Sequence, residues 1–103
     1  MKLEVGMYVR TELYGISKII DMEDLEWIEI DKNKGYLIHR DTILKASNNI
    51  IDLIEVGDYV NGFPVIHKEN DILKCGLLVQ FKENEIKSII TKEQFKSMQY
   101  EVD

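Results

Sequence analysis

A hexapeptide occurs twice in this chain, about half a chain apart. Residues 4 to 9 read EVGMYV and residues 55 to 60 read EVGDYV, so five of six positions repeat at an offset of 51 residues. The same offset aligns Ile38 with Ile89, Leu44 with Phe95, and Lys45 with Lys96. The repeat predicts a short β unit present in two copies, the first at residues 1–51 and the second at residues 52–103.

Runs rich in β-branched and aromatic residues recur at short intervals between turn clusters, which is typical of a β meander. We expect strands near residues 5 to 11, 16 to 21, 26 to 31 and 35 to 39 in the first unit, and near 50 to 60, 63 to 68, 72 to 81 and 86 to 90 in the second.

Local signals place a turn and two helical segments. Asn61-Gly62 lies between apolar runs and predicts a type I′ hairpin turn, and Pro64 then belongs on an edge strand or at a strand start. Residues 91 to 94, TKEQ, have the spacing of a capping box and predict a short helix. Residues 41 to 45 are its weaker counterpart in the first unit.

Four meandering strands, a helical turn and a further strand outline a small SH3-like barrel. No Gly/Ser-rich linker separates the two units, so we expect one fused body. The chain is therefore predicted to be all-β, with two related SH3-like units packed together.

Charge and cysteine content narrow the setting. The formal charge is −6 without a Lys/Arg run, so direct binding to nucleic acid or to an anionic membrane is not expected. Cys75 is the only cysteine, which excludes an intramolecular disulfide and favours a reducing compartment. The N-terminus lacks the apolar segment of a signal peptide, and no apolar run approaches the roughly 18 residues of a membrane span. A cytoplasmic protein is expected.

The densest charge feature is an acidic hairpin with a tryptophan. Strand alternation places Ile28 and Ile30 on one face and Trp27 on the other, among carboxylates. An outward Trp beside acids predicts a contact patch for a basic protein partner. The alternative is a solvated hairpin in which Trp27 covers the junction of the units. The expected contact residues here are Glu23, Asp24, Glu26, Trp27, Glu29 and Asp31, with Asp21 completing the run of acids.

Tyr8 and Tyr59 occupy the same place in the two copies of the hexapeptide. Repeated exposed aromatics can form a partner-binding platform, so both tyrosines join the candidate contact residues. The competing interpretation is that they pack where the repeats meet.

Catalytic and metal-binding patterns are not evident. His39 and His67 are not repeat-equivalent and, with the distant Cys75, do not have the ligand spacing of a zinc site. The acidic run lacks the ligand spacing and Gly of an EF-hand loop. Cys75 lies in an apolar context without an activating base nearby. We therefore expect no enzyme activity, no cofactor and no metal.

Two segments carry a family resemblance. Residues 50 to 62 (IIDLIEVGDYVNG) and 86 to 95 (IKSIITKEQF), together with 5 to 11 (VGMYVRT), resemble small, largely uncharacterised phage and prophage proteins of low-GC Gram-positive bacteria. The resemblance covers about half of the chain and implies an SH3-like phage accessory protein of the bacterial cytoplasm. It brings no catalytic residues.

The leading hypothesis is a non-catalytic phage accessory protein that inhibits or adapts a host protein, in the manner of anti-defence proteins such as anti-CRISPRs. An acidic surface would suit a host protein with a basic nucleic-acid-binding surface. The alternative is a small-ligand or nucleotide sponge that uses the cleft between the units and the repeated tyrosines. A nucleic-acid-associated SH3-like module is third. A homodimer formed through exposed strand edges is a further possibility.

Overall fold

The computed structural model describes residues 2–32 and 35–97, and this part of the chain is mostly β. The expected all-β class is confirmed. In chain order the elements are β1 (Tyr8–Thr11), β2 (Gly15–Met22), β3 (Trp27–Ile30), β4 (Tyr36–His39), the 3-10 turn η1 (Arg40–Thr42), β5 (Ile43–Ser47), the 3-10 turn η2 (Ile50–Leu53), β6 (Tyr59–Val60), β7 (Phe63–Pro64), β8 (His67–Glu69), β9 (Ile72–Lys74), β10 (Gln80–Lys82), the 3-10 turn η3 (Glu83–Glu85), β11 (Ile89–Ile90) and the helix α1 (Lys92–Ser97).

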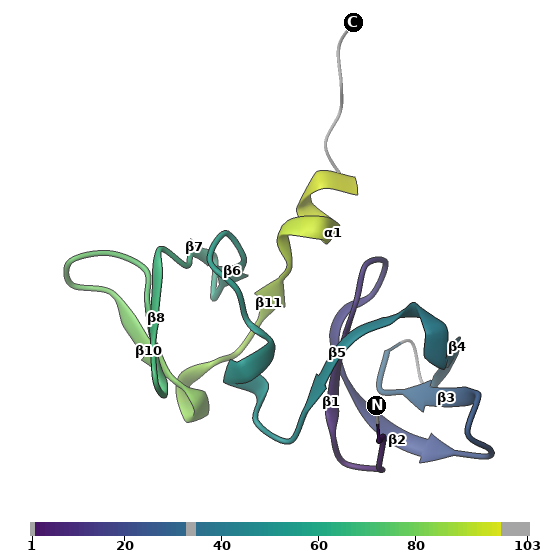
Figure 1. Ribbon diagram of the computed structural model, residues 1–103. Coiled ribbons are helices and arrows are strands. Elements are labelled where there is room, and N and C mark those ends of the chain that lie inside the picture. Colours follow the sequence, from purple (N-terminus) through teal and green to yellow (C-terminus); the bar gives the residue numbers. More distant parts are fainter. Residues whose placement is uncertain (1, 33–34, 98–103) are drawn as a thin grey trace, which may run out of the picture.

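The first half of the chain forms one antiparallel sheet in the order β4-β3-β2-β1-β5. Its register shifts within the β1–β5 and β2–β3 pairs, as occurs at β-bulges, which bend strands. This sheet carries a core of six buried residues: Val9, Ile19, Ile28, Ile30, Ile38 and Ile43. This sheet occupies one end of the molecule (Figure 1).

The second half forms two smaller sheets, β11-β6-β7 and β10-β9-β8. Within residues 2–32 and 35–97, all three sheets are open. The closed barrels expected from the sequence are therefore not formed by this part of the chain. In Figure 1 the hairpins carrying β8 and β10 lie at the end of the molecule opposite β3 and β4, and α1 projects between the two ends.

The local turn predictions are confirmed. Asn61 and Gly62 have φ values of 54° and 85°, as a type I′ turn requires, and Pro64 lies in the edge strand β7. The Thr91 hydroxyl accepts from the Gln94 N–H at 3.2 Å, and Gln94 Oε1 accepts from the Thr91 N–H at 3.1 Å. This reciprocal pair is the predicted capping box, and α1 follows it.

Several predicted strands are shorter or divided. The segment predicted as a strand over 50 to 60 begins instead as η2, because the Asn49 side chain accepts from the Ile51 N–H at 3.1 Å and caps a turn. The run at 72 to 81 is interrupted by a loop that Cys75 N–H closes onto Val79 O, at 2.8 Å. The run at 63 to 68 divides into β7 and β8, and the helical turn expected at 41 to 45 is η1 followed by β5.

The constant 51-residue offset also fails beyond the hexapeptides. Ile38 lies in β4 and pairs with Ile28 of β3, whereas Ile89 lies in β11 and pairs with Val60 of β6. Leu44 is in β5, whereas Phe95 is in α1. These pairs therefore do not hold matching positions in the two halves.

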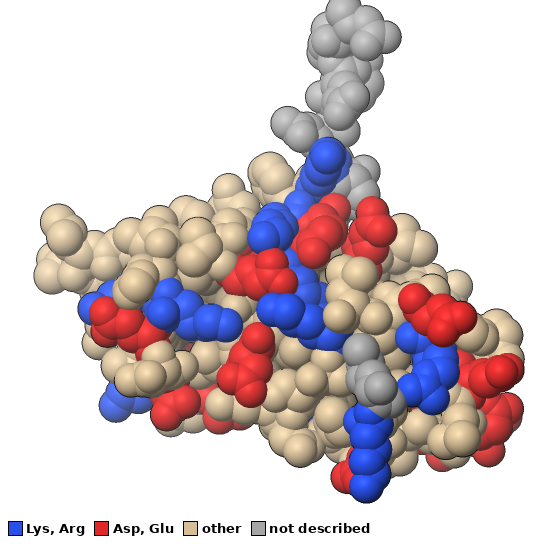
Figure 2. Space-filling model, in the orientation of Figure 1, with Lys and Arg blue, Asp and Glu red and all other residues tan. Residues whose placement is uncertain are grey.

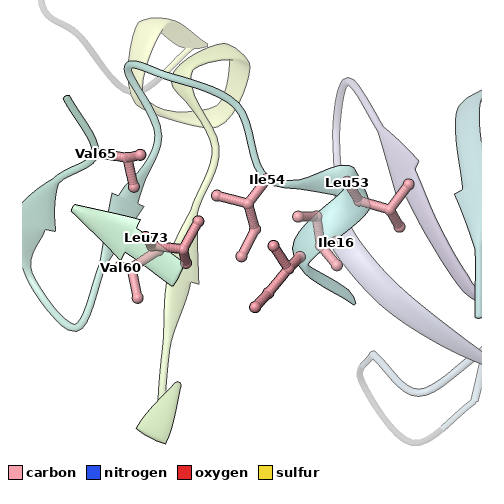
Figure 3. Close-up of a cluster of buried hydrophobic side chains, with 7 residues drawn as sticks. Ile16, Leu53, Ile54, Val60, Val65 and Leu73 are labelled. Carbon is pink, nitrogen blue, oxygen red and sulfur yellow. The ribbon is translucent and has the colours of Figure 1, made fainter. Parts of the chain in front are cut away.

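A second hydrophobic core spans both halves. We call it the seam cluster, and it consists of Ile16, Ile51, Leu53, Ile54, Val60, Val65 and Leu73. Ile16 comes from β2 of the first half, and Ile54 lies between it and Leu73 in Figure 3. Burying these side chains provides apolar contact between residues 1–51 and 52–103.

A buried ion pair reinforces this junction. The Arg10 side chain is 1% exposed, and its Nη1 and Nη2 donate to Oδ2 and Oδ1 of the fully buried Asp58 at 2.5 and 2.9 Å. Nη1 also donates to Leu53 O, and Nη2 donates to Glu93 of α1. Burial acts to lower the pKa of Arg10, but the bonds to Asp58 and Glu93 outweigh it and the pKa is raised. Arg10 therefore stays charged and ties β1 to the second half.

Candidate protein-contact face

The predicted alternation of β3 is confirmed. Ile28 and Ile30 are fully buried beneath the sheet, whereas Trp27 is 47% exposed and Glu29 is half-buried on the outer side. Period-two geometry explains the pattern, because successive side chains of a strand point to opposite faces.

Trp27 packs on the outer side of the sheet against a histidine. Trp27 of β3 is directly opposite His39 of β4, and their rings meet edge to face with centroids 5.1 Å apart. His39 Nδ1 accepts from the Asp41 N–H at 3.2 Å, which fixes the orientation of the imidazole over the start of η1. Trp27 is therefore held on the outer face by His39. The alternative interpretation required Trp27 to cover the junction of the units, but Trp27 does not belong to the seam cluster.

The carboxylates of the acidic hairpin have different roles. Asp24 Oδ1 accepts from the N–H groups of Glu26 and Trp27 at 2.7 and 2.9 Å, and these bonds lower the pKa of Asp24. Asp31 Oδ1 accepts from the Lys18 N–H at 2.8 Å. Asp24 thus shapes the hairpin as an Asx turn does, and Asp31 ties the end of β3 to β2.

The remaining acids face solvent or a strand neighbour. Asp21 lies opposite Glu29 in the β2–β3 pair, an unfavourable like-charge arrangement that water screens at the exposed Asp21. Glu23 and Glu26 are exposed at the hairpin end, where acidic side chains gather in Figure 2. Of the predicted contact residues, Glu23, Glu26 and Trp27 are the ones most available to a partner.

A groove of about 460 Å³ adjoins this face. It lies between the β1–β2 loop, β4, η1 and the start of β5. Its lining combines exposed leucines with tyrosines and two acids: Thr11, Glu12, Leu13, Tyr14, Tyr36, Leu37, Ile38, His39, Asp41, Thr42 and Leu44. Leu13 is 71% exposed, Leu37 47% and Leu44 51%, so the groove presents apolar surface to solvent.

Two tyrosines form one wall of the groove. The Tyr14 and Tyr36 rings lie with centroids 4.8 Å apart, and a hydrogen bond between the side chains raises the pKa of Tyr14. Tyr14 N–H in turn donates to the Thr11 hydroxyl at 3.0 Å, which holds the β1–β2 loop in place. This groove was not predicted from the sequence. Its available signal was the pairing of an aromatic with a leucine at Leu13-Tyr14 and at Tyr36-Leu37.

His39 makes the Trp27 face and the groove one continuous surface, because it contacts Trp27 and also lines the groove. Leu37, another lining residue, lies directly opposite Glu29. We call this surface the contact face: Trp27 and the exposed acids Glu23 and Glu26, with the groove residues. Arg40 supports it from the side, since its N–H donates to Glu26 O and its Nη1 to Leu25 O.

The two predicted tyrosines are not part of this surface. Tyr8 is half-buried against the seam cluster, with Lys18 Nζ 5.8 Å from its ring centroid. Tyr59 is half-buried, and its ring stacks on Phe95 of α1 at a centroid distance of 5.2 Å. Tyr8 therefore packs where the two halves meet, as the competing interpretation of the sequence expected.

His67 and Cys75 lie outside the contact face. His67 Nε2 lies 3.2 Å from Glu69 Oε1 on the surface, and burial raises the pKa of the Cys75 thiol, which opposes thiolate formation. Across residues 2–32 and 35–97, no three His, Cys, Asp or Glu side chains gather closely enough to hold a metal ion.

Comparison with known proteins finds no matching family model, no matching curated protein and no matching solved structure. Among the helices in the described part of the chain, none has the length and apolar character to cross a membrane.

Proposed function

We propose that this chain is a non-catalytic binding protein that captures a segment of another protein on the contact face. The observation that carries the proposal is the half-exposed Trp27, fixed against His39 and continuous with a leucine-lined groove. Tryptophan is enriched among residues that dominate binding energy, and ordered aromatic anchors lose little conformational entropy on binding.

The charges around the face define the kind of partner. Glu23 and Glu26 flank Trp27, and the exposed Glu12 and Asp41 line the groove. A segment with an apolar side chain for the groove and adjacent Lys or Arg residues would complement both features. A host protein with a basic nucleic-acid-binding surface has this chemistry.

We further infer that the two halves are related SH3-like units. In the first half, η1 follows the meander and β5 then returns to pair with β1; in the second, η3 precedes β11, which pairs with β6. Tyr8 is opposite Ser47, and Tyr59 is opposite Ile90, so the offset falls from 51 to 43 residues along the unit. Shorter connections in the second half account for that change.

The sequence resemblance to phage and prophage proteins supports a role against a host protein in the bacterial cytoplasm, as an inhibitor or adaptor. Of the alternatives, a sponge built on the repeated tyrosines is not favoured, because the Tyr8 and Tyr59 rings are engaged in packing within the chain. Nucleic-acid binding by an extended basic surface is not favoured either, because acids and bases are mixed over the face shown in Figure 2.

The test combines affinity capture from the host with a defined pair of charge variants. The partner identified by mass spectrometry is purified and titrated into the protein, while the emission of Trp27, the sole tryptophan, is followed. We expect the emission to shift on binding, and E23K/E26K to weaken binding by about tenfold or more, mostly at low salt. Asp24 is left unchanged because it shapes the hairpin, and Glu29 is left unchanged because it is half-buried.

The matched control is D71K/E83K, which makes the same change in net charge at exposed positions of the second half. This variant should bind as the unmodified protein does. Equal weakening by both double variants would indicate a net-charge effect, and an unshifted Trp27 emission at saturation would reject the contact face.

A further inference from the structure

A second cavity, separate from the contact face, lies between the two halves. This seam cleft has a volume of about 370 Å³. Its walls come from β2, from the second residue after β3, from η2, and from the segment that leads into β11. The lining residues are Ile16, Lys32, Ile50, Ile86, Lys87, Ser88 and Ile89.

The seam cleft has an apolar floor and a cationic rim. Four of its residues are isoleucines, and its charged residues are two lysines, Lys32 and Lys87. Within residues 2–32 and 35–97, neither ammonium group has a carboxylate within ion-pair distance. By contrast, Lys45, Lys74 and Lys92 each pair with a glutamate. An exclusively cationic cavity is therefore a local departure in a chain of net charge −6.

Hydrogen bonds fix the wall that carries Lys87 and Ser88. Asn61 Oδ1 accepts from the N–H groups of Lys87 and Ser88 at 2.7 and 3.1 Å, and Asn61 Nδ2 donates to Glu85 O at 2.9 Å. Asn61 N–H also donates to Ser88 O, at 3.0 Å. The wall is thus held before any ligand arrives, which reduces the entropy lost on binding.

The floor is fixed by packing. Ile16 belongs to the seam cluster, and Ile50, Ile86 and Ile89 are half-buried against it. The apolar surface of the cleft is therefore the outer side of the core that joins the two halves. A ligand in the cleft would touch both halves at once, since Ile16, Lys32 and Ile50 belong to the first and the other lining residues to the second.

We propose that the seam cleft binds a small organic anion whose apolar body lies on the isoleucines and whose phosphate, sulfonate or carboxylate group lies between Lys32 and Lys87. Ser88 supplies a hydroxyl for the same head group. The volume of the cleft is within the range of small-molecule sites and matches a ligand about the size of a mononucleotide. Two lysines do not provide the extended basic track that a nucleic-acid strand requires.

Titration with 8-anilinonaphthalene-1-sulfonate tests the site, because this fluorescent probe combines a single anionic group with an apolar aromatic body. We expect its emission to rise on binding, and K32Q/K87Q to weaken its affinity by about tenfold or more. The matched control is K82Q/K96Q, which removes the same charge from exposed positions outside the cleft and should leave the affinity unchanged. An affinity equal in K32Q/K87Q and the unmodified protein overturns the proposal.

Amide chemical shifts locate the probe independently of the variants. We expect perturbations centred on the N–H groups of Ile16, Ile50, Lys87 and Ser88. Perturbations confined to Leu13 and Tyr14 would place the probe in the groove of the contact face and overturn the seam site. Because the groove is apolar with acids, K32Q/K87Q should not change partner capture, so failure here is distinguishable from failure of the proposed function.

Calorimetry with AMP, adenosine, decanoate and inorganic phosphate then separates the ligand types. Binding of AMP or decanoate that is lost in K32Q/K87Q supports an organic anion and identifies its head group. Equal binding of adenosine and AMP would show that the lysines do not contribute, and binding of phosphate alone would show that the isoleucine floor does not; either result refutes the proposal.

Discussion

Replacing Asp58 by alanine tests whether the buried ion pair holds the two halves together. Asp58 is fully buried, and its oxygens accept from Arg10 Nη1 and Nη2 and from the N–H groups of Glu55 and Lys92, at 2.7 and 2.9 Å. In D58A the Arg10 guanidinium remains buried, with Glu93 as its closest remaining hydrogen-bonded carboxylate. The variant therefore leaves a buried charge only partly compensated.

The expected loss of stability follows from these contacts. Removing one partner of a buried ion pair costs about 3 to 5 kcal/mol. Glu93 compensates part of that loss, while the two backbone donors that lose Asp58 add to it. We therefore expect the free energy of unfolding to fall by about 3 to 5 kcal/mol. With an unfolding entropy of about 2.1 cal/mol/K per residue over 103 residues, Tm should fall by about 14 to 23 °C.

Urea unfolding followed by Trp27 fluorescence and by circular dichroism measures this change. The control is K45A, which removes a partly exposed ion pair with Glu55 and should cost no more than about 1 kcal/mol. The double variant R10M/D58N removes the buried charge altogether and should be more stable than D58A by about 1 to 3 kcal/mol. A loss below about 1 kcal/mol in D58A, or a double variant no more stable than D58A, would refute this account of the junction.

Two further predictions concern the helix and the acid stability of the junction. A Cβ on Gly15 (φ +66°) would overlap Gln94 Oε1 of the capping box, whereas a Cβ on Gly62 (φ +85°) meets no atom within 4 Å. The G15A variant should therefore lose about 1 kcal/mol more unfolding free energy than G62A. Equal losses in the two variants would contradict the contact between Gly15 and Gln94. The hydrogen bond from Lys92 lowers the pKa of Glu55 below its ordinary 4.5 and outweighs burial, which acts to raise this pKa. Glu55 therefore stabilises the fold fully above pH 4.5, and this contribution is lost as the pH falls through its folded pKa. Urea unfolding from roughly pH 3 to 6 should therefore show a shallower acid decline in E55Q, and an unchanged decline would disprove the linkage.

Features set by neighbouring residues could be predicted from the sequence. The alternation over Trp27, Ile28 and Ile30 depends only on strand geometry, and the type I′ turn depends on the tolerance of Asn61 and Gly62 for positive φ. The failures arose where short apolar runs are compatible with more than one local structure. Residues 50 to 54 have an apolar pattern that fits a strand, but the Asn49 cap makes a 3-10 turn whose Ile51 and Leu53 are buried.

The candidate site was predictable only in part for the same reason. The acidic run and the outward Trp27 are visible in the sequence, but the groove needs the β1–β2 loop, β4, η1 and β5 to meet. The exposure of Leu13, Leu37 and Leu44 is a property of that meeting. One sequence feature did mark the partner of Arg10, because Asp58 is the single position at which the two hexapeptides differ.

The sequence alone determined the β class, the hairpin turn, the capping box and the outward position of Trp27, because each depends on preferences of residues close together along the chain. Only the tertiary structure decided that Arg10 meets Asp58 across 48 residues, that the contact face includes a groove, and that a lysine-rimmed cleft lies between the halves. Contacts of this kind depend on how loops and strand edges fold back on one another, and local preferences carry no information on which distant side chains will share a buried space.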